Sequence, residues 1–359
     1  MQKIHDKCQD IQYDVLSQRN LVIVSNRGPY SFHLDENNDF QLKRSRGGLV
    51  TALLGLANQV ESTWISCAMN DDDRTWYNGT VPTGGDDSSL EVCFLRPDPE
   101  AYQRYYQKIA NPLLWFLQHT MWDFMYAPTF NRETWEAWDE GYCLVNSLFA
   151  EAVHKQVMNN PGQTIVMFQD YHLYLAARYL REKEMEGKYP IITHFIHIPW
   201  PGPEDWGLLP GKMRRQILDG LCAVDLLGFQ THEDALNFLR TCESLLPDAR
   251  VNYRKGKVEW HHHVTHVRDF PILIDVKALK EESRTDEVRQ FHQQLMEQFG
   301  GRKLIVRIDR VEPSKNIVRG FQAFDELLEV YPQFKGKVQF LVLLVPSRLE
   351  VEEYQDYLN

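Results

Sequence analysis

The sequence has no apolar run that approaches the roughly 18 residues a membrane-spanning helix needs. It begins MQKIHDKCQD, which is polar and of mixed charge, unlike the start of a secretory signal peptide. Low-complexity tracts and internal repeats are also missing. These absences predict a cytoplasmic globular protein that has no membrane partner.

Cysteine is scarce, and none of the six cysteines belongs to a C-x-x-C motif. We therefore expect reduced, mostly buried thiols. Positive charge is in deficit too, since 39 lysines and arginines face 50 acidic residues and the formal net charge is −11. This balance argues against a nucleic-acid partner, so any phosphate must be bound by a local group of basic residues. Neither G-x-G-x-x-G nor G-x-x-x-x-G-K-[ST] occurs, so no dinucleotide fingerprint or P-loop is indicated.

Short apolar runs alternate with helical patterns along the whole chain. This alternation is typical of an α/β fold in which helices cover both faces of a parallel sheet. The apolar runs that predict buried strands are residues 20–27, 164–170, 191–198, 223–230, 303–310 and 339–348, and residues 251–270 predict a hairpin that turns at Arg254–Lys257.

The pattern restarts near residue 276, which indicates a second domain. We expect an N-terminal extension (1–18), a first doubly wound domain (19–275) and the first part of a second one (276–359).

Several predicted strands end in polar or charged residues. In doubly wound sheets, ligands bind beyond the carboxyl ends of the strands, so these residues are the first candidates for a functional site. They are Asn26–Arg27, Asp170, His197, Gln230, Arg310 and Ser347–Arg348.

Two of these ends have both a functional and a structural interpretation. Asp170 lies at a strand-to-helix junction, where it is either a helix N-cap or a carboxylate that holds a sugar hydroxyl. His197 is either a packed core residue or a site residue. The prolines at 199, 201 and 203 restrict the backbone after His197 and favour a site residue, because a ring held in place suits a catalytic contact.

Two segments could bind phosphate. RSRGGL (44–49) places Gly47 and Gly48 at the start of a predicted helix, where backbone N–H groups attract anions, although a tight turn would explain the same glycines. RIDRVEPSKN (307–316) places Arg310 and Lys315 between a strand and a helix, which suits a diphosphate, with surface salt bridges as the alternative.

Histidines and aromatic residues are less informative. In an extended strand only His261 and His263 of the HHH run would point to the same side. No cysteine or acidic residue stands at a spacing typical of metal ligands, so we expect no metal site. Tyr106 and Trp115 are either core residues or platforms for a sugar ring.

Eight stretches, taken in order, carry a family resemblance. They are VSNR (24–27), GGL (47–49), YYxxxxNxxLW (105–115), DYHL (170–173), FIHIPWP (195–201), DLLGFQT (225–231), RxxxSKN (310–316) and SR (347–348). In this order they resemble the trehalose-6-phosphate synthase family, retaining glucosyltransferases of the GT-B fold with two facing Rossmann-like domains. The resemblance covers nearly the whole chain and implies that the second domain is incomplete.

The resemblance implies transfer of glucose from UDP-glucose to glucose 6-phosphate, which gives trehalose 6-phosphate without a metal or other cofactor. The implied acceptor site consists of Arg27, Tyr106, Trp115, Asp170 and Arg348. The implied donor site consists of Gly47, Gly48, His197, Gln230, Arg310 and Lys315. Among these, His197, Asp170 and Arg310 are the implied catalytic residues.

The chain also departs from the family pattern. Gln169 stands where the family commonly has histidine, and RVEPSKN replaces RLDYSKG. Two alternatives therefore stay open. One is a related transferase with another phosphorylated acceptor, of the glucosylglycerol-phosphate or cyclitol-phosphate type. The other is a non-catalytic sugar-phosphate-binding protein, since the family's donor-binding half continues beyond the last residue of this sequence. Self-association into a homo-oligomer is compatible with either.

Overall fold

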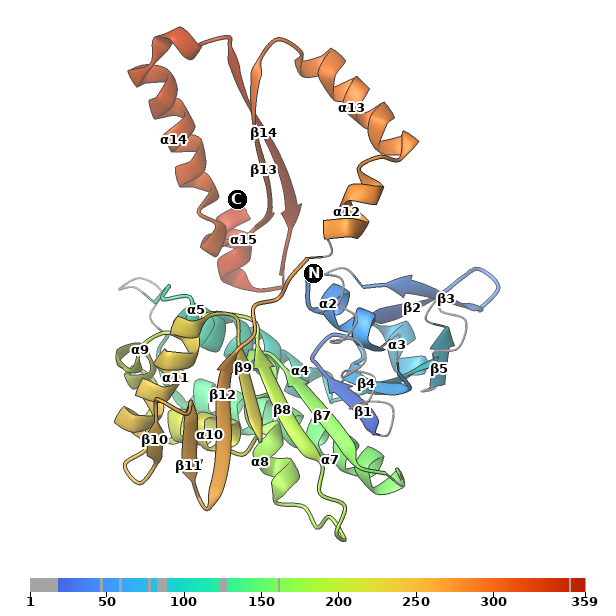
Figure 1. Ribbon diagram of the computed structural model, residues 1–359, viewed down its shortest axis with the longest axis vertical. Coiled ribbons are helices and arrows are strands. Elements are labelled where there is room, and N and C mark those ends of the chain that lie inside the picture. Colours follow the sequence, from blue (N-terminus) through green and yellow to red (C-terminus); the bar gives the residue numbers. More distant parts are fainter. Residues whose placement is uncertain are drawn as a thin grey trace. The chain divides into compact units, whose positions relative to one another are not determined.

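The computed structural model describes residues 19–45, 48–57, 60–76, 79–82, 89–122, 128–160, 162–274, 276–348 and 350–358. The chain divides into two compact units, one up to Pro271 and one from Ile272 onward (Figure 1). The sequence places the change of domain near residue 276, a few residues further along. The expected N-terminal extension, residues 1–18, lies outside the described residues.

The first unit is built on a 10-stranded sheet. In spatial order its strands are β10 (Arg250–Asn252), β11 (Lys257–Trp260), β12 (His263–Asp269), β9 (Leu226–Phe229), β8 (Ile191–Ile196), β7 (Thr164–Gln169), β1 (Asn20–Val24), β4 (Ser62–Cys67), β6 (Ser89–Leu95) and β5 (Gly79–Pro82). Neighbouring strands from β12 to β6 run parallel, whereas β10, β11 and β5 join antiparallel at the edges.

The side of the sheet on which successive strands are added changes at β1. From β1 the chain adds β4 and β6 on one side, and then β7, β8 and β9 on the other. In sheets with such a reversal, ligands bind beyond the carboxyl ends of the two central strands, which here are β1 and β7. The residues of β1 from Leu21 to Val24 are buried, as expected for a central strand covered on both faces.

Helices cover this sheet (Figure 1). They are α2 (Gly48–Ala57), α3 (Asp71–Thr75), α4 (Pro99–Gln103), η1 (Arg104–Trp115), α5 (Phe116–Gln118), α6 (Arg132–Ala137), η2 (Trp138–Cys143), α7 (Leu144–Asn159), η3 (Tyr171–Leu173), α8 (Ala176–Arg181), α9 (Pro203–Gly207), α10 (Gly211–Leu221) and α11 (His232–Leu245). A separate hairpin consists of β2 (Tyr30–Leu34) and β3 (Phe40–Arg44).

The predicted hairpin within 251–270 is a three-stranded meander, β10–β11–β12. Its first turn lies at residues 253–256, close to the predicted position. Its second turn contains His261 and His262, whose φ angles of 48° and 62° are left-handed. The expectation that the HHH run lies in one extended strand is therefore wrong. Among the described residues, no group of three or more histidine, cysteine or acidic side chains is arranged to hold a metal ion.

The second unit has a two-stranded parallel sheet, β13 (Lys303–Val311) with β14 (Val338–Pro346). Its helices are α12 (Val276–Glu282), α13 (Asp286–Phe299), η4 (Pro313–Lys315), α14 (Ile317–Val330), η5 (Pro332–Phe334) and α15 (Glu352–Leu358). The sequence predicts β13 as a buried strand, but most of its residues are exposed. Two strands alone leave their faces and edges largely uncovered, which is the physical reason for the difference.

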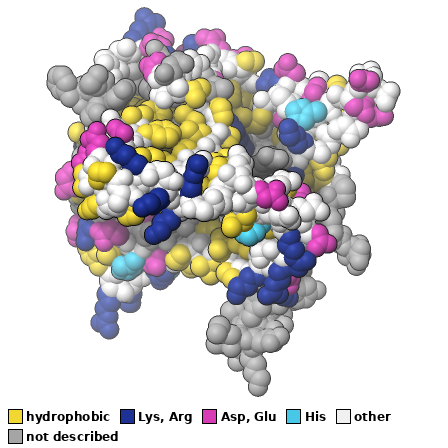
Figure 2. All heavy atoms as spheres, turned by 90° about the horizontal axis from the view of Figure 1, so that it is seen from above, with side chains coloured by type: hydrophobic (Ala, Val, Ile, Leu, Met, Phe, Trp, Pro, Cys, Tyr) yellow, Lys and Arg dark blue, Asp and Glu magenta, His cyan; other side chains and the backbone are white. Residues whose placement is uncertain are grey.

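Hydrophobic side chains gather on the face drawn in Figure 2, with lysines and arginines among them. No helix in the described part of the chain is both long and apolar enough to cross a membrane. No disulfide joins the described cysteines, and the Sγ atoms of Cys222 and Cys242 lie 3.9 Å apart in the core.

Candidate active site

The strand ends that the sequence singles out in the first unit belong to four neighbouring strands. Arg27, Asp170, His197 and Gln230 follow β1, β7, β8 and β9, which lie side by side and parallel. These residues therefore lie along one edge of the sheet, and Arg27 and Asp170 follow the two central strands at the reversal point, where ligands bind in such sheets. The tertiary structure thus gathers into one region residues that are 203 positions apart (230 − 27) in the sequence.

Arg27 is exposed at this edge and is held by a tyrosine. Its Nη2 donates to the hydroxyl of Tyr106 over 3.1 Å, and its guanidinium carbon lies 5.7 Å from the centre of that ring. The Tyr106 ring is 5% exposed and stacks on Tyr102 and on His172, with ring planes within 9° of parallel in both cases. A solvent-accessible guanidinium on a buried aromatic support is well suited to bind a phosphate or a carboxylate.

The segment that carries Tyr106 is the π-helix η1, which contains Pro112. Asn111 is fully buried, donates from Nδ2 to the carbonyl of Tyr106 over 3.0 Å and accepts from the Tyr171 hydroxyl over 2.9 Å. Asn111 therefore supplies a hydrogen bond within the π-helix, whose turns are wider than those of an α-helix. It also connects η1 to η3, which begins immediately after Asp170. Widened turns of this kind are frequent at functional sites.

Asp170 has a strained backbone, with φ 67° and ψ 176°, a region used almost only by glycine. Three hydrogen bonds to the end of β8 hold it there. Its N–H donates to the Phe195 carbonyl at 2.7 Å, its carbonyl oxygen lies 3.0 Å from His194 Nε2, and its Oδ1 accepts from the His197 N–H at 3.3 Å. The structure gives Asp170 no side-chain capping bond to η3, so the N-cap interpretation is not supported. Strain of this kind, maintained by surrounding bonds, points to a positioned carboxylate.

His197 is held by a hydrogen bond to its ring and by the anchored turn that follows it. Its Nε2 lies 2.9 Å from Oε1 of Gln169, which favours a proton on Nε2 and leaves Nδ1 as an acceptor. Burial lowers the pKa of His197 to about 4, so the ring is neutral at pH 7. After it, Trp200 is fixed by a bond from its N–H to Asp234 and by stacking on Trp206. The proline-rich turn is thus anchored, as the sequence suggests.

The structure also describes two further predicted site residues of the first unit, Trp115 and Gly48. Trp115 is 2% exposed and its ring centre lies 3.9 Å from that of His119, so the structure shows it as a packed residue. Gly48 begins α2, and a Cβ added to it would meet nothing within 4 Å. The space beside Gly48 is therefore open, while Gly47 lies outside the described residues.

In the second unit, the loop after β13 carries two cations around one acid. Glu312 is completely buried and its carboxylate lies 3.2 Å from Arg310 Nη2 and 3.6 Å from Lys315 Nζ. The Ser314 hydroxyl donates to the same carboxylate over 2.8 Å. The side chains of Arg310 and Lys315 are 51% and 38% exposed, so the cations reach solvent while Glu312 holds them together. Both cations therefore form the salt bridges that the sequence leaves as an alternative, although the acid they share is buried. The assignment of Arg310 and Lys315 to a diphosphate stays a prediction.

Arg348 follows β14 with a left-handed backbone, φ 50°. Its Nη1 donates to the hydroxyl of Tyr354, and its guanidinium carbon lies 5.2 Å from the centre of that ring. Arg348 thus repeats, within the second unit, the arginine-on-tyrosine arrangement that Arg27 has in the first.

The sequence interpretation missed two residues that organise these sites. Gln169 is noted there only as a departure from a family pattern, yet it fixes the ring of His197. Glu312 lies between the two cations that the sequence selected, and its acidic side chain within RVEPSK was the available signal.

The chain is similar to known proteins along most of its length. A model of glycosyltransferase family 20 matches residues 19–359. The UDP-forming alpha,alpha-trehalose-phosphate synthase of Schizosaccharomyces pombe is 32% identical over 360 residues, which cover 99% of this chain and 66% of that protein. A counterpart from Aspergillus fumigatus is 31% identical over 353 residues, which cover 95% of this chain and 63% of that protein.

Solved structures give the same result for the fold. The E. coli protein with UDP-2-fluoro glucose bound has a TM-score of 0.75 and 27% identity, over 94% of this chain and 67% of that one. A trehalose-6-phosphate synthase structure has a TM-score of 0.75 and 28% identity, over 94% of this chain and 68% of that one. The chain thus spans about two thirds of the length of these relatives. It belongs to glycosyltransferase family 20 and has the α/β architecture of the GT-B fold.

Proposed function

We propose that this chain is the acceptor-binding domain and the start of the donor-binding domain of a retaining glucosyltransferase. The proposed reaction moves glucose from UDP-glucose to glucose 6-phosphate and yields trehalose 6-phosphate and UDP, in the cytoplasm. The names of the relatives support it, as does the bound UDP-2-fluoro glucose of the E. coli structure. The observation that carries it is the exposed Arg27 guanidinium on Tyr106, at the same sheet edge as the strained Asp170.

In this proposal the acceptor and donor sites use different residues. Arg27, Tyr106 and Arg348 bind the acceptor phosphate, and Asp170 binds its sugar. Trp115, which the family resemblance also assigns to the acceptor site, is packed and 2% exposed, so its part is to support the site from the core. Arg310 and Lys315 bind the donor diphosphate. Gly47, Gly48, His197 and Gln230 complete the donor site around the transferred glucose.

The chemistry follows from charge. Breaking the bond between glucose and diphosphate builds negative charge on the leaving oxygen, which fixed cations such as Arg310 stabilise. A neutral His197, with Nδ1 as an acceptor, can bind a sugar hydroxyl without competing for the diphosphate. Asp170 is held by its strained backbone where it can accept a hydrogen bond from the acceptor sugar. Because the cations are supplied by side chains, the scheme requires no metal ion.

Calorimetry of the chain tests the acceptor half directly. We expect glucose 6-phosphate to bind, and Arg27→Ala to weaken its binding at least about tenfold, since one charged hydrogen-bonding group is lost. Arg132→Ala is the matched control, because Arg132 is 92% exposed and pairs only with its helix neighbour Glu136 among the described residues. Equal affinity of the Arg27→Ala variant and the unaltered chain would contradict the acceptor assignment.

Titrations with glycerol 3-phosphate and a cyclitol phosphate separate the alternative acceptors, since the proposal requires glucose 6-phosphate to bind more tightly than either. Release of UDP from UDP-glucose, measured with and without glucose 6-phosphate, separates an enzyme from a binding protein. Binding of glucose 6-phosphate without acceptor-dependent UDP release would favour the non-catalytic alternative.

A further inference from the structure

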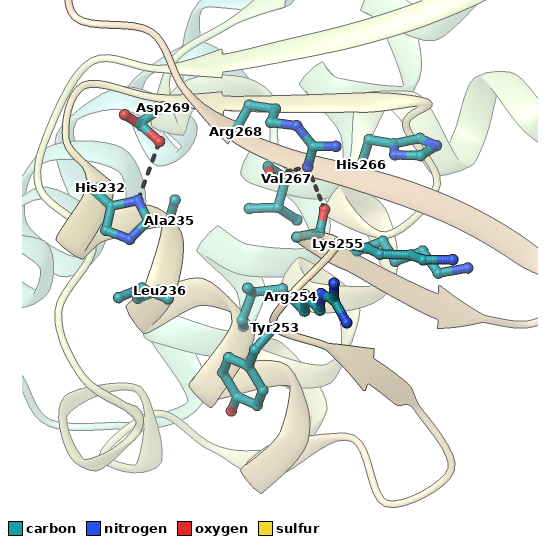
Figure 3. A pocket seen from close by; sticks show the side chains of 13 residues that line it. His232, Ala235, Leu236, Tyr253, Arg254, Lys255, His266, Val267, Arg268 and Asp269 are labelled. Atoms are coloured by element: carbon teal, nitrogen blue, oxygen red, sulfur yellow. Dashed lines mark hydrogen bonds and ion pairs between the residues drawn. The ribbon is translucent and has the colours of Figure 1, made fainter.

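A cavity of about 600 Å³ lies in the first unit, and its lining contains none of the residues assigned above. Its walls come from the first turns of α11, from the β10–β11 hairpin and from the end of β12 (Figure 3). His232 and Asp269 lie on one side of it, and the arginines of the hairpin and of β12 on the other (Figure 3). None of the sequence motifs that indicate the transferase includes these wall residues.

The cavity is strongly basic although the chain is acidic. Its walls carry Arg254, Lys255, Lys257 and Arg268, together with two histidines, and a single carboxylate, Asp269. That carboxylate lies 3.3 Å from Nδ1 of His232. Four cations thus face one cavity in a protein whose formal net charge is −11.

The structure records no ion pair for any of these four cations with another described residue. Elsewhere in the first unit arginines and lysines commonly have a carboxylate partner, as in Arg181–Asp225 at 2.8 Å and Arg240–Glu233 at 2.7 Å. Glu243 of α11 does not pair with these cations and accepts a hydrogen bond from the hydroxyl of the wall residue Tyr253 over 2.7 Å. Like charges that share one cavity repel one another, and a bound anion would relieve that repulsion.

Arg268 is fixed in advance of any ligand. Its Nη1 donates to the carbonyl oxygens of Gly256 and Val267, both over 2.7 Å. Gly256 has a φ of +53°, and a Cβ on it would lie 2.6 Å from the same Nη1, so only glycine lets the turn pack this closely on the guanidinium. A guanidinium held at one nitrogen keeps the rest of its donor fork in a defined orientation, which suits two oxygens of a phosphate.

The remaining walls are apolar. Ala235, Leu236, Leu239 and Val267 line the cavity beside the cations. An inorganic ion would leave these walls without a contact, whereas a phosphorylated molecule with an uncharged body would meet both kinds of surface. An extended polyanion such as nucleic acid does not match a single cavity on an acidic chain.

We propose that this cavity is a second phosphate site, which binds a small phosphorylated molecule through Arg254, Lys255, Lys257 and Arg268. The proposal is independent of the transferase function, because it uses none of the residues assigned to it. The phosphate group is the shared chemistry, and its source is either a sugar phosphate or a nucleotide.

Lysine footprinting tests the site locally. The chain is acetylated briefly in the presence of glucose 6-phosphate, UDP, inorganic phosphate or an oligonucleotide, and each lysine is quantified by mass spectrometry. We expect Lys255 and Lys257 to be modified at least about threefold more slowly with glucose 6-phosphate or UDP than in chloride of equal ionic strength. Lys43 and Lys277, which are exposed in other parts of the chain, serve as controls and should not change.

Two variants separate this site from the transferase site. Arg268→Gln should abolish the protection, and circular dichroism checks that the variant is folded. Arg27→Ala should leave the protection intact, even where it abolishes acceptor binding. Protection that disappears in Arg27→Ala, that is equalled by chloride, or that only an oligonucleotide produces would overturn the proposal. The protecting ligand identifies the source as sugar phosphate or nucleotide.

Discussion

Among single residues, Asp170 offers a test of stored backbone strain. A non-glycine residue at φ 67° and ψ 176° costs on the order of 1–3 kcal/mol. We expect Asp170→Gly to be more stable than Asp170→Ala by about 1 kcal/mol or more, the reverse of the usual order, because both lose the carboxylate but only glycine relieves the strain. Urea unfolding of the two variants measures the difference.

Both Asp170 variants should also bind glucose 6-phosphate less tightly than the unaltered chain. If alanine proved as stable as glycine, the backbone would not be strained, and the argument that Asp170 is held for function would fail. Asp98→Ala, which removes an ordinary helix cap, is the comparison for loss of a carboxylate, and it should leave the binding of glucose 6-phosphate unchanged.

Two buried histidines, His194 and His197, make stability depend on pH. Burial lowers the pKa of each to about 4, whereas an unfolded histidine titrates near 6.5. Below about pH 6.5 the unfolded state takes up protons that the folded state does not, so stability is complete above this pH and is lost as the pH falls towards about 4. The expected loss between about pH 7 and pH 5 is on the order of 2 kcal/mol for each histidine.

Urea unfolding at pH 7 and pH 5 measures that loss. A His194→Gln variant separates the contribution of His194 to the pH dependence of stability from the contribution of the carboxylates. The variant should be less stable at pH 7, because His194 bonds the Asp170 carbonyl, yet it should lose less stability on acidification. An unchanged pH dependence in His194→Gln would show that His194 does not carry the effect.

Among the structural elements, the loop between β13 and α14 depends on Glu312. Its buried carboxylate is shared by Arg310, Lys315 and Ser314. Glu312→Gln keeps the shape but removes the charge, so the two cations repel each other without compensation. We expect a loss of about 1–2 kcal/mol in the second unit, limited because both cations are partly solvated.

Hydrogen exchange of peptides from β13 and α14 measures this local loss. Glu329→Gln, at an exposed position of α14, is the matched control and should have little effect. Similar exchange in both variants would mean that Glu312 does not organise the loop. The affinity for UDP is a separate measurement. Removing the negative charge of Glu312 would strengthen UDP binding, whereas loosening the two cations would weaken it.

For the chain as a whole, the main consequence of the second unit is the apolar surface that its two-stranded sheet exposes. Val306, Ile308 and Val345 are 53%, 69% and 59% exposed. Exposed apolar surface of this kind promotes association. We expect the chain to bind the dye ANS and to self-associate, as seen by sedimentation.

The double variant Ile308→Lys and Val345→Glu should reduce both dye binding and self-association if this surface is responsible. Leu208→Lys, at a 57% exposed leucine of the first unit, is the control and should change neither. Dye binding that persists in the double variant would locate the exposed apolar surface elsewhere.

Local sequence was enough to predict most of the central strands and helices and the polar ends of those strands, because the period and composition of a segment are local properties. It was also enough to name Arg27, Asp170, His197 and Arg310 as candidate site residues, and their roles stay a prediction. It could not predict that β9, β8, β7 and β1 are neighbours, since strand order depends on how distant segments pair in the folded chain.

The same holds for contacts between residues far apart in the sequence. The Arg27–Tyr106 bond, the Gln169–His197 bond and the bond from the His197 N–H to Asp170 join positions 79, 28 and 27 apart, which no local pattern records. The basic cavity is a further case. Its cations are ordinary surface residues in the sequence, and they become one site only because a hairpin turn folds back onto the end of β12.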